Sequence, residues 1–254
     1  MVMSMSNLRL GVVGLSLILL VYGLARMEAP VTITAKPAHI LAYHDITPKP
    51  QDSWSRTPKR LETDFRLLAE KGVKVIKLET YIESVLKGAS LPDSWVVITF
   101  DDGAAGQFRY ARPLLKRFGY PATFYVNTDG RAGSMTVENL AQLVGEGFQV
   151  ASHGKSHTPF TKLSLKQARR EIKQSLEFLR GKLGVETQDF CLPNGLYRPE
   201  HEPLFVEMGL RSIALTTTDH GPGHPDLIKI RRLEVKRDTK SIEMLARVLG
   251  RTRQ

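Results

Sequence analysis

The chain has 254 residues, 42% of them hydrophobic, and a formal net charge of +10. This length can bury the core of one large α/β domain. The basic residues are scattered along the sequence without an aromatic-interleaved patch, zinc finger or helix-turn-helix pattern, so no nucleic-acid partner is expected. The single cysteine, Cys191, excludes an intramolecular disulfide and a cysteine-rich zinc site.

An uncharged apolar segment occupies residues 10–25. It is longer than a typical signal-peptide core and slightly short for a membrane span. The small residues Gly23 and Ala25 suit cleavage before Arg26, while an uncleaved anchor and a buried helix are the alternatives. We therefore expect residues 1–35 to be a signal peptide or membrane anchor with a short linker. The rest of the chain is then exported to the periplasm or cell envelope.

From residue 39 onward, short apolar runs alternate with amphipathic segments, the pattern of βα units around a mostly parallel sheet. The expected fold is α/β, with one barrel-like domain over residues 36–254. We predict strands at 40–43, 73–78, 96–100, 122–126, 148–152, 189–192, 213–216 and 228–235.

Two helices carry clear boundary signals. One is expected over 107–118 and ends at Gly119. Another is expected to begin at Ser164 and to run to about Lys182, before Gly184. The second helix has a stripe of residues predicted to be buried: Leu165, Ala168, Ile172, Leu176 and Leu179.

Two adjacent acids, Asp101 and Asp102, follow the uninterrupted apolar run 95–100. Such a run predicts a strand buried on both faces. Desolvating a carboxylate costs several kcal/mol unless a cation or hydrogen bonds compensate. The pair therefore indicates a partner, which we take to be a metal ion.

Two histidines four residues apart, His153 and His157, supply further ligands. This spacing can place both rings on one face of a turn, although such a pair alone is weak support for a metal site. Two imidazoles and one carboxylate leave positions open for water and substrate, as in catalytic zinc sites. His44 follows the first predicted strand, so it is expected on the same rim of strand ends.

The motif Thr99–Gly103 (TFDDG) and the element at residues 153–157 (HGKSH) resemble the polysaccharide deacetylase family, also called the NodB homology family or carbohydrate esterase family 4. The resemblance covers about residues 38–236 and implies a distorted (β/α) barrel of the NodB type. Residues 41–46, 214–218 and 230–235 are similar to the branch that deacetylates poly-β-1,6-N-acetylglucosamine, in which the motif order is circularly permuted.

The resemblance implies roles for five residues. Asp102, His153 and His157 would hold one divalent metal, for which Zn²⁺ suits the ligands and Co²⁺, Ni²⁺ or Fe²⁺ are alternatives. The metal would polarise the acetamide carbonyl and activate water. Asp101 would accept the proton of the water, and His44 would protonate the departing amine. A core histidine is the alternative interpretation of His44.

The third motif departs from the family pattern R-x-P-Y-G. Cys191 stands in place of its arginine and Asn194 in place of its aromatic residue. Arg232 matches a basic position of the permuted branch and is expected to steady Asp101, with a surface position as the alternative. Further substrate contacts are expected at Tyr43, Pro193, Asn194 and Gly195.

The predicted activity is hydrolysis of N-acetyl groups from an N-acetylglucosamine-containing extracellular or envelope polysaccharide. Deacetylation of peptidoglycan or chitin-type oligomers and a catalytically impaired sugar-binding homologue are alternatives. A glycosidase also uses paired acids, but it has no need of two histidines. Expected partners are the polysaccharide, the membrane through the N-terminal segment, and the machinery of exopolysaccharide synthesis or export.

Overall fold

The computed structural model describes residues 40–130, 132–215 and 228–249. The apolar segment 10–25 lies outside these ranges, so the expected signal peptide or anchor stays a prediction. Within the described ranges, no helix has the length and apolar character needed to cross a membrane.

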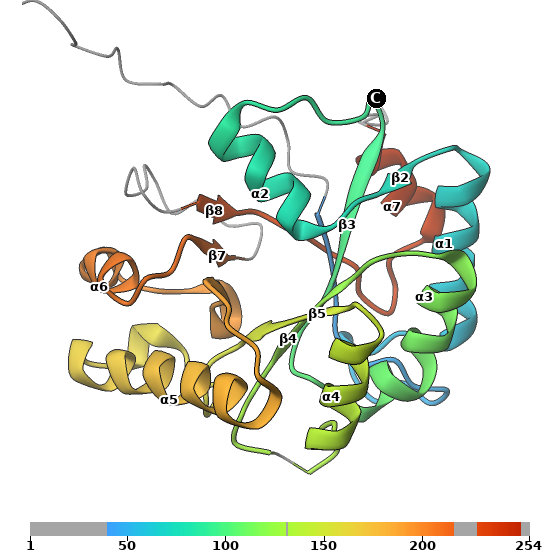
Figure 1. The fold of residues 1–254 in the computed structure, drawn as a ribbon. Helices are drawn as coiled ribbons and strands as arrows, with labels where there is room; N and C mark the ends of the chain where they lie inside the picture. The colour runs from blue at the N-terminus through green and yellow to red at the C-terminus, as the bar shows by residue number, and fades with distance from the viewer. Residues whose placement is uncertain (1–39, 131, 216–227, 250–254) are drawn as a thin grey trace, which may run out of the picture. The chain divides into compact units, whose positions relative to one another are not determined.

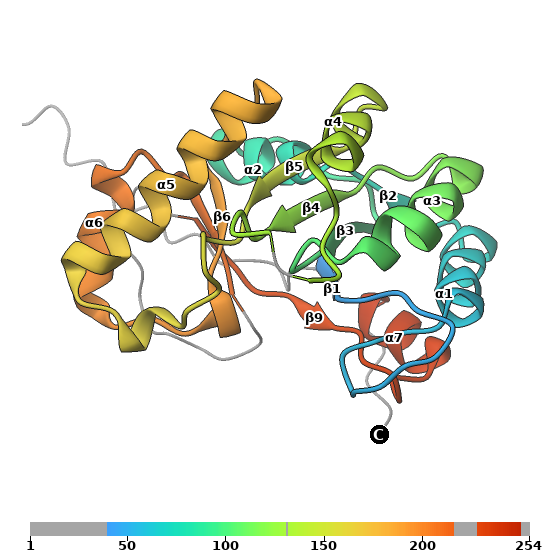
Figure 2. The same ribbon diagram turned by 90° about the horizontal axis from the view of Figure 1, so that it is seen from below.

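The described strands form one sheet in which all the observed pairings are parallel. Its order is β8-β7-β6-β5-β4-β3-β1-β9, and β2 pairs with β3 beside this path. Figures 1 and 2 show the sheet curving into a half-barrel. The strands are β1 (Ile40–Tyr43), β2 (Lys74–Val75), β3 (Trp95–Phe100), β4 (Thr123–Val126), β5 (Gln149–Ser152), β6 (Asp189–Cys191), β7 (Ser212–Ala214), β8 (Ile228–Ile230) and β9 (Leu233–Glu234).

Most connections between the strands carry a helix. Seen from below in Figure 2, α1, α3, α4 and α5 lie outside the strands. The parallel half-barrel with outer helices confirms the predicted fold class. The helices are α1 (Pro58–Glu70), α2 (Leu78–Lys87), α3 (Arg112–Phe118), α4 (Val137–Gly145), α5 (Leu165–Leu183), α6 (Glu202–Glu207) and α7 (Ser241–Val248).

The boundary signals of α5 are confirmed. Ser164 caps its N-terminus in a reciprocal capping box with Gln167, and Gly184 ends it in the left-handed conformation. One residue of the predicted buried stripe is wrong: Leu165, the first residue of the helix after its cap, is exposed. The helix predicted over 107–118 begins with a wide π turn, Gln107–Ala111, before α3.

The strand predicted over 228–235 is two strands on opposite edges of the sheet. β8 pairs with β7 and β9 pairs with β1. Between them Arg231 is exposed, whereas the side chain of Arg232 turns inward and is buried. The chain thus crosses from one edge of the sheet to the other where Arg232 enters the interior. The strand predicted over 73–78 is shorter, because Leu78 begins α2.

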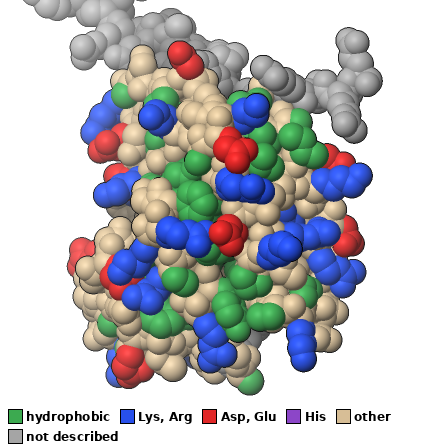
Figure 3. Space-filling model, turned by 90° about the vertical axis from the view of Figure 1, so that its right-hand side faces the viewer, with side chains coloured by type: hydrophobic (Ala, Val, Ile, Leu, Met, Phe, Trp, Pro, Cys, Tyr) green, Lys and Arg blue, Asp and Glu red, His purple; other side chains and the backbone are tan. Residues whose placement is uncertain are grey.

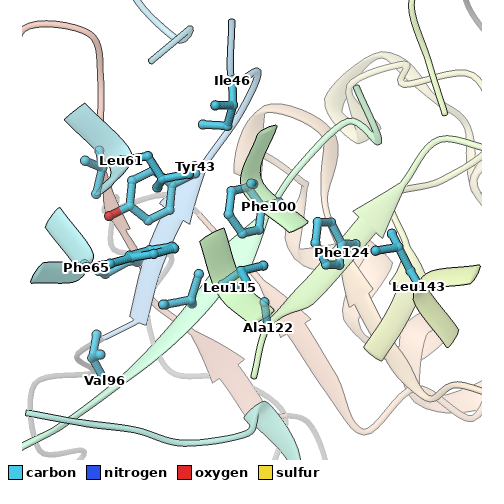
Figure 4. Packing of buried hydrophobic residues seen from close by; sticks show 14 of the residues in the cluster. Tyr43, Ile46, Leu61, Phe65, Val96, Phe100, Leu115, Ala122, Phe124 and Leu143 are labelled. Carbon is cyan, nitrogen blue, oxygen red and sulfur yellow. The ribbon is translucent and has the colours of Figure 1, made fainter. Parts of the chain in front are cut away.

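The core between the sheet and the outer helices is aromatic. Phe100 stacks on Phe124 with ring centroids 5.0 Å apart, and Tyr43 stacks on Phe100 at 5.5 Å. Leucines from the helices, such as Leu115 and Leu143, pack around these rings (Figure 4). The opposite face of β3 packs in the barrel interior, so the strand is buried on both faces as its apolar run predicts.

Basic side chains are distributed over the surface. On the face that Figure 3 shows, Lys and Arg side chains lie among acidic and apolar ones and do not gather into one patch. This distribution agrees with the expectation that the net charge of +10 marks a solvated surface.

Candidate active site and metal centre

The carboxyl ends of the parallel strands bring the predicted chemistry to one rim. His44 follows β1, Asp101 and Asp102 follow β3, His153 follows β5, and Asn194 follows β6. In barrels of parallel strands this end carries the active site. The topology therefore accounts for the meeting of residues up to 150 positions apart.

Asp102, His153 and His157 form a compact group of potential metal ligands. One ligand atom from each lies within 4.8 Å of the others. The Nε2 atoms of His153 and His157 lie 3.4 and 3.1 Å from Oδ1 of Asp102. That oxygen is buried and has no hydrogen-bond partner within the described chain. An unsatisfied buried carboxylate oxygen facing two imidazoles is the environment a divalent cation fits.

A hydrogen bond fixes the tautomer of His153. Its Nδ1 lies 2.9 Å from the carbonyl oxygen of Cys191. A carbonyl can only accept, so Nδ1 carries a proton, and Nε2 is the ring atom that faces Asp102. The backbone of Cys191 therefore orients a candidate metal ligand, although its thiol is not in the group of Asp102, His153 and His157.

Backbone strain concentrates at this rim. Three described residues other than glycine have positive φ: Asp102 at 73°, His157 at 61° and Asn194 at 60°. Such conformations cost about 1–3 kcal/mol each and persist where the surrounding structure enforces them, often at functional sites. All three are residues to which the sequence assigns a functional role. The strain turns Asp102 away from the direction taken by its neighbour Asp101.

Asp101 is buried and pairs with Arg232. Nη1 and Nη2 of Arg232 donate to Oδ1 and Oδ2 of Asp101, both at 2.6 Å. Burial raises the pKa of the Asp101 carboxyl, but the charge and hydrogen bonds of Arg232 outweigh it and lower that pKa below its ordinary value. Nη1 also donates to Thr99 Oγ1, and Nε to the carbonyl of Leu215. Arg232 is thus buried rather than on the surface, and it holds Asp101 ionised and oriented.

His44 is half-buried beside the acids. Its ring packs against Trp54 with centroids 4.8 Å apart. Burial lowers the pKa of His44 below 6.5, against the opposing charges of Asp101 and Asp102. Its backbone carbonyl accepts a hydrogen bond from Gln107. Its partial exposure and the nearby charges of Asp101 and Asp102 favour a place in the site over the core interpretation.

The predicted substrate contacts divide into exposed and buried positions. Asn194 is exposed on the rim, whereas Pro193 and Gly195 are buried, so only Asn194 presents a side chain to a ligand. The substrate contact expected at Tyr43 is wrong. Its side chain is fully buried, and its hydroxyl donates to Asp64. The alternation of β1 turns Tyr43 toward the outer helices, away from the site.

Three residues of the site escaped the sequence interpretation: Trp54, Gln107 and Glu171. Trp54 lies against His44, and Gln107 donates to the carbonyls of His44 and Asp101. Glu171, on α5, accepts hydrogen bonds from the turn before His157. None belongs to a motif. In the sequence, only Trp54 could have drawn attention, as a tryptophan in the segment that follows the first predicted strand.

The fold and the site define a parallel half-barrel with a candidate mononuclear metal centre at the carboxyl ends of its strands. A family model described as "Polysaccharide deacetylase" matches residues 88–213. Residues 88–213 of the chain thus match the polysaccharide deacetylase family.

Similar proteins carry the same description. YxkH of Bacillus subtilis (strain 168), provisionally assigned by its name to the polysaccharide deacetylases, is 26% identical over 172 residues, which are 66% of this chain and 61% of that protein. The chain thus spans less than two thirds of the length of the curated relatives it matches.

Solved structures share the fold at low sequence identity. The deacetylase PplD of Streptococcus pyogenes, determined in complex with acetate, has a TM-score of 0.74 at 19% identity, covering 82% of this chain and 96% of that one. IcaB of Ammonifex degensii has a TM-score of 0.73 at 20% identity, covering 83% and 96%.

Proposed function

We propose that this protein removes N-acetyl groups from an N-acetylglucosamine-containing polysaccharide, using one divalent metal ion. The observation that carries the proposal is the pairing of two distinct sites at one strand end. Asp102 faces two imidazoles without a hydrogen-bond partner, and Asp101 is held ionised by Arg232. The two adjacent acids thus supply two different groups: Asp102 belongs to a cation site, and Asp101 is a base.

The protein groups have complementary tasks. A divalent metal held by Asp102, His153 and His157 would supply Lewis-acid polarisation of the acetamide carbonyl and of the attacking water. Asp101, ionised at neutral pH, accepts the proton of that water. His44 in its protonated form donates a proton to the sugar nitrogen as the C–N bond breaks, because an amide anion is a very poor leaving group. Acetate and a free amine are the products.

A glycosidase is disfavoured by the same geometry. Glycoside hydrolysis needs two carboxyl groups flanking the bond, one acting as an acid. Asp101 forms a bidentate pair with arginine and Asp102 faces two histidines. Neither is placed as a protonated acid. An impaired sugar-binding homologue is disfavoured because the acids, both imidazoles and His44 converge on one rim.

The proposal extends to the substrate polymer and to the cellular location of the protein. The resemblance of residues 41–46 and 230–235 to the poly-β-1,6-N-acetylglucosamine branch favours an exopolysaccharide over peptidoglycan or chitin. An export signal or anchor within residues 10–25 would place the domain at the cell envelope, alongside the synthesis or export machinery of the polymer. Zn²⁺ suits the ligand set, with Co²⁺, Ni²⁺ and Fe²⁺ as alternatives.

Acetate release from oligomers tests this function. Metal-stripped protein is incubated with oligomers of poly-β-1,6-N-acetylglucosamine, chitin and peptidoglycan, before and after restoration with Zn²⁺ or Co²⁺. We expect acetate only after metal is restored, fastest from the β-1,6-linked oligomers. Cleavage of the glycosidic bonds of an oligomer without release of acetate would indicate a glycosidase. Metal binding with no product would indicate a sugar-binding homologue.

A further inference from the structure

The two imidazoles of the metal site are held in different ways. His153 is fixed by the sheet: its backbone N–H donates to Val126 and its ring to the carbonyl of Cys191. His157 lies beyond the strand in the left-handed conformation. In the described chain no backbone–backbone hydrogen bond anchors His157 itself. The position of its ring therefore depends on the turn that precedes it, residues 154–156.

One carboxylate from α5 clamps this turn. Oε2 of Glu171 accepts the backbone N–H groups of Lys155 and Ser156, each at 2.9 Å. Oε1 accepts the hydroxyl of Ser156 at 2.8 Å. Three hydrogen bonds from consecutive residues to one ionised group are strong and geometrically restrictive. Ser156 also lies within hydrogen-bond distance of Thr158, on the far side of His157.

The turn is held from its other side as well. The carbonyls of Gly154 and Lys155 accept hydrogen bonds from the backbone of Thr128 and Asp129. Gly154 has φ +77°, and a β-carbon there would lie 3.4 Å from Oε2 of Glu171. The turn is thus fixed between the β4 rim and α5. Ser152 Oγ accepts the N–H of Gly154 at its start, and Glu171 supplies the side-chain hydrogen bonds to residues 155 and 156. The strained backbone of His157 needs such support to persist.

We propose that Glu171 is a positioning residue that sets the metal affinity of the site through His157. The inference rests on the metal centre of the proposed function, yet it concerns binding alone. Glu171 contacts the turn and not the three ligand side chains, so its effect passes through the backbone of residues 155 and 156. Residues that orient metal ligands in this way typically change affinity 10- to 100-fold when replaced.

Metal titration of the metal-free full chain tests the proposal. Zn²⁺ and Co²⁺ affinities are measured by competition with a chromophoric chelator, without substrate. Glu171→Ala is expected to weaken binding about 10- to 100-fold. Glu171→Gln keeps one acceptor oxygen and should lose less. Glu177→Ala, on the same helix but in an exposed ion pair with Lys173, serves as the matched control and should bind like wild type.

A double-mutant cycle separates positioning from general damage. In a His157→Ala background, Glu171→Ala should cause no further loss of affinity, because Glu171 acts only through His157. An equal loss in both backgrounds would overturn the proposal, and so would wild-type affinity in either folded Glu171 variant. Glu171→Gln keeps the test decisive if the alanine variant unfolds. The titration is independent of turnover, so a failed deacetylase assay leaves its outcome unchanged.

Discussion

Adjacent acids with opposite surroundings define the chemistry at the scale of single residues. Asp101 continues the line of β3 into the barrel and meets Arg232, while the positive φ of Asp102 turns its side chain toward the histidines. Arginine lowers the pKa of the Asp101 carboxyl, and the two imidazoles lower that of Asp102 against the effect of burial. Both are ionised at neutral pH, and in the proposed mechanism Asp101 is the base and Asp102 a metal ligand.

The pairing of Asp101 with Arg232 predicts a selective loss of turnover. Arg232→Lys keeps the positive charge but cannot form the two parallel hydrogen bonds to Asp101. We expect kcat at saturating metal to fall about 10- to 100-fold while metal affinity stays unchanged. Arg231→Lys, at the exposed neighbouring position, is the control. Unchanged kcat in Arg232→Lys would show that Asp101 needs no such orientation.

Burial predicts the titration of His44. Its pKa is lowered, so the unfolded chain, with a pKa near 6.5, binds protons more readily than the fold. The contribution of His44 to the free energy of unfolding is therefore retained above pH 6.5 and declines as the pH falls toward the lowered value. An NMR titration of the metal-free protein should show a resonance that titrates below pH 6.5 and is absent from His44→Asn. A midpoint above 6.5 would contradict this environment.

At the scale of elements, the sequence predicts the bounds of most strands correctly. β1 matches its predicted bounds, and β3 to β6 match within about one residue, because uninterrupted apolar runs and turn signals mark them directly. The prediction of one strand over residues 228–235 overlooks a change of phase: the apolar residues stand at 228 and 230 and then at 233 and 235, on either side of Arg231 and Arg232. At this break Arg232 turns inward and pairs with Asp101, a contact between residues 131 positions apart in the sequence. Tyr43 was misplaced because its neighbour His44 belongs to the site while its own ring faces the core.

A buried ion pair joins α1 to the segment before α7. Arg56 donates from Nε and Nη2 to Asp64 at 2.6 Å, and from Nη1 to the carbonyls of Lys236 and Thr239. Both side chains are fully buried. The pair therefore holds together residues 180 positions apart, on the side of the fold where Tyr43 packs.

Breaking this pair should destabilise the fold without touching the metal site. Asp64→Asn leaves Arg56 buried without its counter-charge, and we expect the free energy of unfolding to drop by about 3–5 kcal/mol. Chemical denaturation measures the change. Glu83→Gln removes an exposed partner of Lys87 and should cost at most about 1 kcal/mol. A loss equally small for Asp64→Asn would mean that the buried pair adds little to stability.

At the scale of the whole molecule, the site is a product of topology. Its side chains come from the ends of β1, β3 and β5 and from the crossing between β8 and β9. The sequence could point to the candidate metal ligands and the candidate base because motifs mark them, and the structure brings these side chains together. It could not predict the support from Gln107 and Glu171, because these residues reach the site only through the packing of helices on the sheet. The export or anchor role of residues 10–25 stays a prediction.

Because the ligands are assembled only in the fold, metal binding should stabilise it. A ligand that binds only the folded state at 100 times its Kd adds about 2.7 kcal/mol to the free energy of unfolding. Saturating Zn²⁺ should therefore raise the Tm of wild type clearly, and that of His153→Ala hardly at all. Differential scanning calorimetry measures both. An equal shift in the variant would place the metal elsewhere.

The most direct test compares acetate release by wild type and Asp101→Asn at saturating Zn²⁺, on β-1,6-linked N-acetylglucosamine oligomers. The two proteins are first shown to bind the metal with equal affinity, because Asp101 is not one of the three proposed ligands. We predict release by wild type and a loss of at least about 100-fold in the variant, the scale of general base catalysis. Equal rates in the two proteins would contradict the assignment of Asp101 as the base and with it the proposed mechanism.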